Sequence, residues 1–237
     1  MVIENKKDAK FVQKNFFEIK HKLLNKHSVA ETTFSKLLVQ ANIYHVREKG
    51  NYTKNTRWCY YDFYLPLYGI YIEIDGSSHN SEEQKKIDKE KAQIIRNKNE
   101  YLIRYTNKEV LSMDSIDVDA IIQRVAPTMR TKKHPLRDYV KIFHKRFNHR
   151  VRQVIMDIKK SVSFDVDEKQ KVYLYDNQIG DYFCFDNLFY AKLNTELTAN
   201  EIYKLLNNFE YKKSSSRKYV FGWTLEECEN NVAKVYY

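Results

Sequence analysis

The chain has few of the residues that break or cross-link a polypeptide: 5 glycines, 3 prolines and 3 cysteines among 237 residues. So few glycines and prolines exclude low-complexity linkers as a large part of the chain. Cys59, Cys184 and Cys228 are odd in number and far apart, which argues against a disulfide framework and against a zinc site with CxxC spacing. The cysteines therefore predict a reducing, intracellular setting.

Long apolar runs are also missing. No stretch approaches the roughly 18 apolar residues of a membrane span, and the first seven residues lack the apolar core of a signal peptide. We therefore expect a soluble, cytoplasmic protein with no membrane partner. A hydrophobic fraction of 43% supports a packed core, and the length suffices for one large domain or two small ones.

The net charge of +10 is concentrated in one segment. From Arg130 to Lys160, eleven lysines and arginines stand against two acids, whereas the rest of the chain is nearly neutral. A localised basic block predicts a polyanionic partner. The alternatives are a solvated helix face and an acidic protein partner. A membrane surface is disfavoured, because the segment lacks a broad face of Trp, Leu and Phe.

The spacing of apolar residues predicts an α/β fold in the first half of the chain, in the order helix, three strands, helix, strand, helix. Ser28 and Glu31 form a capping-box pattern that predicts a helix start. Helices are expected at 10–26, after Ser28, at 81–97, from Asn107 and at 117–125. Strands are expected at 43–47, 57–64, 70–75 and 101–105, with a polar loop at 48–56.

The second half begins after a boundary that Pro127 and Pro135 mark. One or two basic helices are expected within 139–157, followed by a small α+β unit. That unit has predicted strands at 171–175, 182–185 and 219–223 and a helix at 199–207. The predicted domains are therefore an α/β domain at 1–126, a basic helical region at 127–165 and a small α+β domain at 166–237.

Three carboxylates are predicted to converge in the first half. Asp62 lies near the end of one strand, and Glu73 and Asp75 lie two apart on the next, so these two point to the same face. His79 follows on the loop just beyond. Crowded carboxylates repel one another, and a divalent cation is the usual reason to gather them. The pattern indicates metal-assisted chemistry on a phosphate, with Asp62, Glu73 and Asp75 binding Mg²⁺ or Mn²⁺.

Four sequence pieces resemble a known nuclease family in their order. They are Asp-Phe-Tyr-x-Pro from Asp62, Ile-Glu-Ile-Asp-Gly-x-x-His ending at His79, a helix with Asp88 and Lys91, and the run 102–107 followed by Glu-Val. Together they resemble the Vsr-like branch of the PD-(D/E)xK nucleases, which includes the very-short-patch-repair endonuclease and a group of homing endonucleases. The resemblance covers about residues 28–125 and implies a restriction-endonuclease-like αβββαβ core with a mixed sheet.

The resemblance also implies catalytic roles. Asp62 would be the primary metal ligand, and Glu73 would hold or polarise a second position. Asp75 stands where the wider superfamily often has a lysine. His79 would then be the general base or acid, because its pKa lies near neutrality.

Glu31 and Asp88 match the family's N-terminal glutamate and the acid on the helix after the histidine. Each candidate also has a structural alternative. Asp62 would then simply end a strand, Glu31 would only cap its helix, His79 would be an ordinary loop histidine, and Asp88 would pair with surface lysines.

Lysines and arginines from three segments of the chain are expected to contact phosphates. Lys91, Arg96 or Arg104 would neutralise the phosphate at the cut, and the helical stripe that includes Phe143, Phe147 and Val151 would leave basic side chains exposed. The C-terminal unit weakly resembles the NUMOD-type DNA-binding modules, with residues 198–207 as the helix aimed at a groove; a structural or dimerisation unit is the alternative. The predicted DNA-binding residues are Lys91, Arg130, Lys132, Lys133, Arg137, Lys141, Lys145, Arg146, Arg150, Arg152, Lys159, Lys212, Lys213, Arg217 and Lys218.

These features and the resemblance together predict a Mg²⁺-dependent endonuclease of homing type that cuts double-stranded DNA, with no small-molecule cofactor beyond the metal. The resemblance also implies an origin in a phage or mobile element. One active site cuts one strand, so a double-strand break would need a homodimer or two successive nicks. A non-catalytic nucleic-acid-binding protein on a nuclease-like fold and an RNA-cleaving nuclease with the same core are the alternatives.

Overall fold

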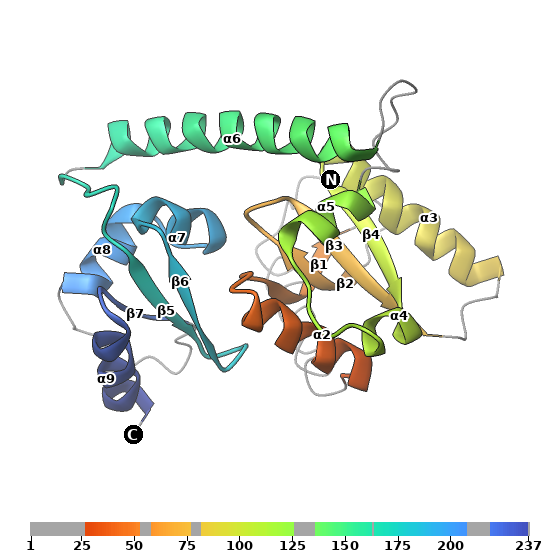
Figure 1. Ribbon diagram of the computed structural model, residues 1–237, viewed down its shortest axis with the longest axis horizontal. Helices are drawn as coiled ribbons and strands as arrows, with labels where there is room; N and C mark the ends of the chain where they lie inside the picture. The colour runs from red at the N-terminus through yellow and green to blue at the C-terminus, as the bar shows by residue number, and fades with distance from the viewer. Residues whose placement is uncertain are drawn as a thin grey trace, which may run out of the picture. The chain divides into compact units, whose positions relative to one another are not determined.

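The computed structural model describes residues 27–52, 58–76, 82–125, 136–162, 164–207 and 219–236. This part of the chain is an α/β structure with a four-stranded and a three-stranded sheet (Figure 1). It divides into two units. Unit 1 contains the described residues of 27–38, 45–65 and 69–125, and unit 2 contains those of 39–44, 66–68 and 136–236. The predicted helix at 10–26 lies outside the described residues.

Unit 1 follows the predicted element order. Its sheet has the strand order β1-β2-β3-β4 and is mixed, because β1–β2 and β2–β3 are antiparallel whereas β3–β4 is parallel. A parallel pair needs a crossover connection, which α3 provides. The elements are α2 (Val29–Gln40), β1 (Val46–Tyr52), β2 (Trp58–Leu65), β3 (Ile70–Asp75), α3 (Glu82–Asn97), β4 (Tyr101–Thr106), α4 (Asn107–Leu111) and α5 (Val118–Val125).

Local sequence explains where several of these elements begin and end. The Oγ atom of Ser28 accepts a hydrogen bond from the Glu31 backbone N–H at 3.1 Å, as the capping-box pattern predicts. Gly69, with φ of 65°, closes the turn between β2 and β3 by donating to the Leu65 carbonyl at 2.9 Å. A residue without Cβ adopts this left-handed conformation at no steric cost.

The prediction for β1 was wrong at both ends. The strand begins at Val46 and continues to Tyr52, through residues expected to form a polar loop. β1 lies at the edge of the sheet and pairs with β2 from Val46 to Tyr52, with one interruption at Glu48. Backbone pairing thus holds a strand whose polar sequence lacks the alternation of a half-buried strand.

Helices cover both faces of the unit 1 sheet. Phe34 of α2 is fully buried, and its ring lies 5.3 Å from Phe63 and 5.2 Å from Tyr105. On the other face, Ile95 of α3 packs in a buried cluster with Tyr61. The sheet is therefore the middle layer of three, which buries the central strands β2 and β3.

Unit 2 is a second α/β arrangement around an antiparallel sheet with the order β6-β5-β7. Two of its helices, α7 and α9, were not predicted from the sequence. The backbone of Gly222 lies so close to α9 that a Cβ atom there would be 2.4 Å from the Cys228 backbone nitrogen. The elements are α6 (Leu136–Ser161), β5 (Val172–Asp176), β6 (Asp181–Phe185), α7 (Leu188–Asn194), α8 (Ala199–Asn207), β7 (Tyr219–Gly222) and α9 (Leu225–Tyr236).

A short segment from between α2 and β1 completes unit 2. Tyr44 is 4% exposed and donates a hydrogen bond to Oδ2 of the buried Asp176 at 2.8 Å. Asn42 donates to the Cys184 carbonyl and accepts from the Cys184 backbone N–H, at 2.8 and 3.0 Å, as a neighbouring strand would. Asn42 and Tyr44 thus belong to unit 2, although they precede their bonding partners by more than a hundred positions in the sequence.

α6 is a single basic helix of 26 residues. The predicted stripe is confirmed where its side chains are described: Phe143 and Val151 are buried, and Phe147 is partly buried. None of the helices in the described ranges is long and apolar enough to cross a membrane.

Candidate active site

β2 changes the direction of its side chains at Asp62. Tyr61 donates a hydrogen bond to the Lys91 carbonyl on α3 at 3.1 Å, whereas Phe63 packs against Phe34 on α2. Residues two apart on a regular strand share a face, so the strand must twist sharply between them. The pairing of β2 with β3 starts only at Phe63, and Oδ2 of Asp62 instead accepts a hydrogen bond from the Ile74 backbone N–H at 2.6 Å.

Glu48 occupies the corresponding place on β1. The register pairs Arg47 with Phe63 and Lys49 with Tyr61, and it skips the pair formed by Glu48 and Asp62. Glu48 has φ of 50°, a left-handed conformation that costs energy for a residue with a side chain. Its residue exposure is only 6%, and its Oε1 atom lies 4.0 Å from Nδ1 of His27. A buried acid held in a strained backbone conformation calls for a functional explanation.

His27 and Glu31 lie next to Glu48. Nδ1 of His27 is 3.2 Å from Oε2 of Glu31 and 4.0 Å from Oε1 of Glu48. One ligand atom from each of the three residues lies within 4.8 Å of the other two. These atoms form a candidate metal-binding group that draws on the start of α2 and the middle of β1.

The electrostatics of Glu48 and Asp62 support one shared site. Burial, followed by the charges of Asp62 and Glu31, raises the pKa of Glu48 to about 7. Burial also raises the pKa of Asp62 to about 7, against the hydrogen bond from Ile74, and the charges of Glu31 and Glu73 contribute further. The charges of Arg47 and Lys91 lower the pKa of Glu48, and the charge of Lys91 lowers that of Asp62. Burial and the neighbouring acids outweigh these cations, so both pKa values stay raised.

Glu73, by contrast, is already neutralised. It is 5% exposed, and its Oε1 atom forms an ion pair with Nζ of Lys91 while Oε2 lies 2.7 Å from Nη2 of Arg104. Lys91 also lies 5.4 Å from the ring centroid of Tyr61. The nuclease pattern often has a lysine on β3, where this chain has Asp75. Lys91 of α3 places an ammonium group beside the same strand, through its ion pair with Glu73.

Arg104 of β4 also forms ion pairs with Asp88 and Asp75, two further acids that the sequence predicted for the site. Its Nη2 atom is 3.2 Å from Oδ1 of Asp88, and its Nη1 atom is 3.5 Å from Oδ2 of Asp75. Burial alone would lower the pKa of Arg104, but the hydrogen bond to Asp88 and the charges of Glu73 and Asp75 raise it. Burial raises the pKa of Asp88, but the hydrogen bond and charge of Arg104, the hydrogen bond from Gln84 and the charge of Lys91 together lower it further than burial raises it.

The predicted acids thus separate into two groups. Glu31 and Asp62 join Glu48, while Glu73, Asp75 and Asp88 surround Arg104. His79 lies outside the described residues, so its role stays a prediction.

Sequence reasoning missed His27 and Glu48 as candidates. Glu48 falls in a polar run that reads as a loop, and only the pairing with β2 places it opposite Asp62. His27 lies four residues before Glu31, a helical spacing that could have suggested the contact.

No family model, curated protein or solved structure matches the chain.

Several predicted DNA-binding side chains are exposed on α6. Lys159 is a partial exception, because its Nζ atom pairs with Glu168 and lies 5.9 Å from the Phe189 ring centroid. Arg130, Lys132, Lys133, Lys212, Lys213, Arg217 and Lys218 lie outside the described residues, as does the side chain of Arg137. The exposed α6 cations are Lys141, Lys145, Arg146, Arg150 and Arg152.

Proposed function

We propose that the protein is a metal-dependent DNA endonuclease whose active site lies at Glu48 and Asp62, on a restriction-endonuclease-like core. The observation that carries the proposal is the buried Glu48 carboxylate, which lies opposite Asp62 in the strand register and forms a candidate metal-binding group with His27 and Glu31. The pKa values of about 7 mean that ionising these two carboxylates destabilises the metal-free fold, and a bound cation would offset this cost.

The donor set fits Mg²⁺ or Mn²⁺. Asp62 and Glu48 would hold the ion, with Glu31 and His27 beside them; carboxylate oxygens suit both metals, and an imidazole suits Mn²⁺ better. Glu73 and Asp75 were expected to be ligands, but Lys91 and Arg104 already balance their charge. When bound, such an ion activates water and offsets charge that develops on the phosphate.

The remaining charged residues would position one another and offset the charge that develops on the phosphate. Arg104 fixes the Glu73 carboxylate, and Glu73 in turn holds Lys91 close to Asp62. Lys91 would therefore present its positive charge where a bound phosphate gains negative charge. Hydrolysis adds water to the phosphorus, breaks one P–O bond and delivers a proton to the leaving oxygen; His27 and His79 are the candidate proton carriers.

DNA is proposed as the substrate because of α6. Its exposed lysines and arginines lie on one helix whose apolar stripe is buried, so they are available to phosphates. The homing-type assignment rests on the small unit that accompanies the basic helix, and a phage or mobile-element origin remains part of the same proposal. A single site per chain predicts nicking unless two copies act together.

A plasmid assay tests the proposal directly. Wild-type protein with Mg²⁺ should convert supercoiled plasmid to nicked or linear DNA, and EDTA should stop the reaction. Asp62→Asn and Glu48→Gln should each lower the rate at least about a hundredfold, because each removes a charged ligand. Asp114→Asn, which changes an exposed acid outside the cluster, is the matched control and should cut like wild type.

Two results would count against the proposal. Cleavage by Asp62→Asn at the wild-type rate would show that Asp62 is not part of an active site. DNA binding without any metal-dependent cleavage would favour a non-catalytic binding protein. A parallel digest with structured RNA separates the two substrates: faster cleavage of RNA than of duplex DNA would replace DNA by RNA in the proposal.

A further inference from the structure

Unit 2 contains a pocket that the proposed nuclease activity does not use. It has a volume of about 340 Å³ and lies between α8, β7 and the residues that follow α6. α8 packs on β7 within this unit, as Figure 1 shows. Such a volume lies within the range of sites that bind a small ligand or a single side chain.

Aromatic rings form the walls of this pocket. Phe164 and Tyr203 stack with their ring centroids 3.8 Å apart and their planes at 14°, and Trp223 stands at 74° to Tyr203 with centroids 6.4 Å apart. Leu188, which is 2% exposed, also lines the pocket. A stacked pair with a third ring set across it offers both an aromatic face and an edge to an incoming group.

The rim of the pocket is acidic. Asp165 and Asp167 line it and are exposed, and among its described lining residues none is a lysine or an arginine. Oδ1 of Asp167 accepts a hydrogen bond from the Lys169 backbone N–H at 2.8 Å, which fixes the carboxylate in its loop. In a chain with a net charge of +10, this pocket therefore has the opposite sign to the basic helix α6.

We propose that the pocket binds an arginine side chain of a partner polypeptide. Aromatic faces attract cations through the ring quadrupole, and carboxylates at the rim add charge-assisted hydrogen bonds. Arginine fits better than lysine because a planar guanidinium stacks on a ring while it donates two parallel hydrogen bonds to a carboxylate. A nucleobase would stack equally well, but its phosphates would meet Asp165 and Asp167.

The test uses the full-length chain and a blocked Gly-Arg-Gly peptide as the probe. The chain has two tryptophans, so the Trp58→Phe variant leaves Trp223 as the only indole reporter. Fluorescence of this variant should change saturably with the arginine peptide, and calorimetry on wild-type protein should give the same affinity. The same peptide with citrulline, which keeps the shape and loses the charge, should bind about fivefold to tenfold more weakly.

Variants of the rim then assign the binding to the pocket. Asp165→Asn with Asp167→Asn should reduce arginine-peptide affinity to that of the citrulline peptide, and both positions are exposed, so the fold should persist. Asp181→Asn on β6 is the matched control and should change nothing.

Three outcomes would overturn the inference. They are equal affinity for the arginine and citrulline peptides, no saturable binding of the arginine peptide to wild-type protein, and tighter binding of deoxycytidine monophosphate than of the arginine peptide. None of these readouts involves DNA cleavage, so the result is independent of the proposed nuclease activity.

Discussion

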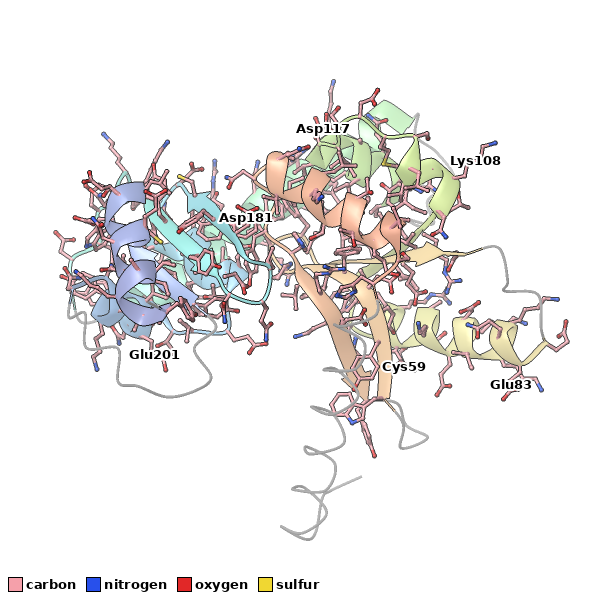
Figure 2. The ribbon with its side chains drawn as sticks, turned by 90° about the horizontal axis from the view of Figure 1, so that it is seen from below. Cys59, Glu83, Lys108, Asp117, Asp181 and Glu201 are labelled. Atoms are coloured by element: carbon pink, nitrogen blue, oxygen red, sulfur yellow. The ribbon has the colours of Figure 1, made fainter. Side chains whose placement is uncertain are left out.

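Glu48 and Asp62 lie opposite one another on β1 and β2, at the one place where the register of these two strands is interrupted. Past this point β2 no longer pairs with β3, and β1 and β2 continue as a two-stranded ribbon that carries Cys59 (Figure 2). The interruption twists β2 so that Tyr61 and Phe63 face opposite helices. A distorted strand pair of this kind re-aims side chains, and here it gathers carboxylates.

The first prediction concerns the stability of metal-free protein against pH. Asp62 and Glu48 have folded pKa values of about 7, above the values of about 4 expected for these groups in an unfolded chain. Between about pH 4 and 7 the folded state therefore binds more protons, so the free energy of unfolding should fall as the pH rises. The loss should be on the order of 3 kcal/mol, and urea denaturation in EDTA at pH 5 and pH 7.5 measures it.

Neutral variants should remove this pH dependence. Asp62→Asn or Glu48→Gln should flatten the curve and make the metal-free protein more stable than wild type at pH 7.5, while abolishing stabilisation by Mn²⁺. Asp114→Asn keeps the pair and should reproduce the wild-type curve. A wild-type protein that gains stability from pH 5 to 7.5 would contradict the electrostatic account.

Much of the unit 1 fold was predictable because its strands and helices show their own signals. The apolar runs of β2 and β3 and the turn at Gly69 locate the central hairpin, and the Ser28 capping pattern locates α2. β1 was not predictable in the same way, since its polar residues are held by pairing with β2 rather than by burial. In unit 2, α9 begins at a local signal that sequence reasoning missed: Oγ1 of Thr224 accepts from the Glu227 backbone N–H at 3.1 Å, and Oε2 of Glu227 accepts from the Thr224 backbone N–H at 3.3 Å, which is a capping box.

The site was predictable only where its residues are close in sequence. Asp62, Glu73 and Asp75 come from one hairpin, in which Asp62 accepts a hydrogen bond from the backbone N–H of Ile74, the residue between the other two acids. Lys91 and Arg104 decide which of these acids stay uncompensated, and both act across the sheet from separate elements. Alternation along a strand cannot show such ion pairs, so the ligand set inferred from the sequence differs from the one the geometry favours.

The second prediction tests Lys91. Lys91→Met leaves the buried Glu73 with Arg104 and removes positive charge beside Asp62. Cleavage should fall at least about a hundredfold, mainly in kcat, and the free energy of unfolding should drop by about 2 kcal/mol. Plasmid cleavage under single-turnover conditions and urea denaturation measure the two effects.

A control for Lys91 exists on the same helix. Lys85 pairs with Glu82 at 2.7 Å, and both side chains are exposed, at 54% and 82%. Exposed pairs contribute little, so Lys85→Met should change cleavage less than twofold. Equal loss of activity in both variants would point to general charge attraction by α3 rather than a role at the site.

The third prediction concerns α6. Arg146→Ala with Arg150→Ala should reduce the slope of log affinity against log salt for duplex DNA by about 1.8, because each contact neutralises one phosphate. Both side chains are exposed, so thermal stability should stay unchanged. Lys159→Ala offers the contrast: the Lys159 charge is already paired with Glu168, so this variant should change the salt slope less than removal of one of the two arginines. An unchanged slope in the double variant would exclude α6 as the phosphate-contacting surface.

The last prediction addresses the segment that completes unit 2. Burial and the neighbouring charge of Asp176 raise the pKa of Tyr44, so its hydroxyl stays a donor at all ordinary pH values. Tyr44→Phe keeps the ring against Phe183 but removes a donor from a carboxylate that is 1% exposed. The free energy of unfolding should fall by about 1–3 kcal/mol, the usual effect of leaving a buried polar group without its partner. Tyr190→Phe is the matched control, because no described residue bonds its hydroxyl, and it should cost less than about 0.5 kcal/mol. Equal stability of the two variants in urea denaturation would mean that Tyr44 contributes packing alone.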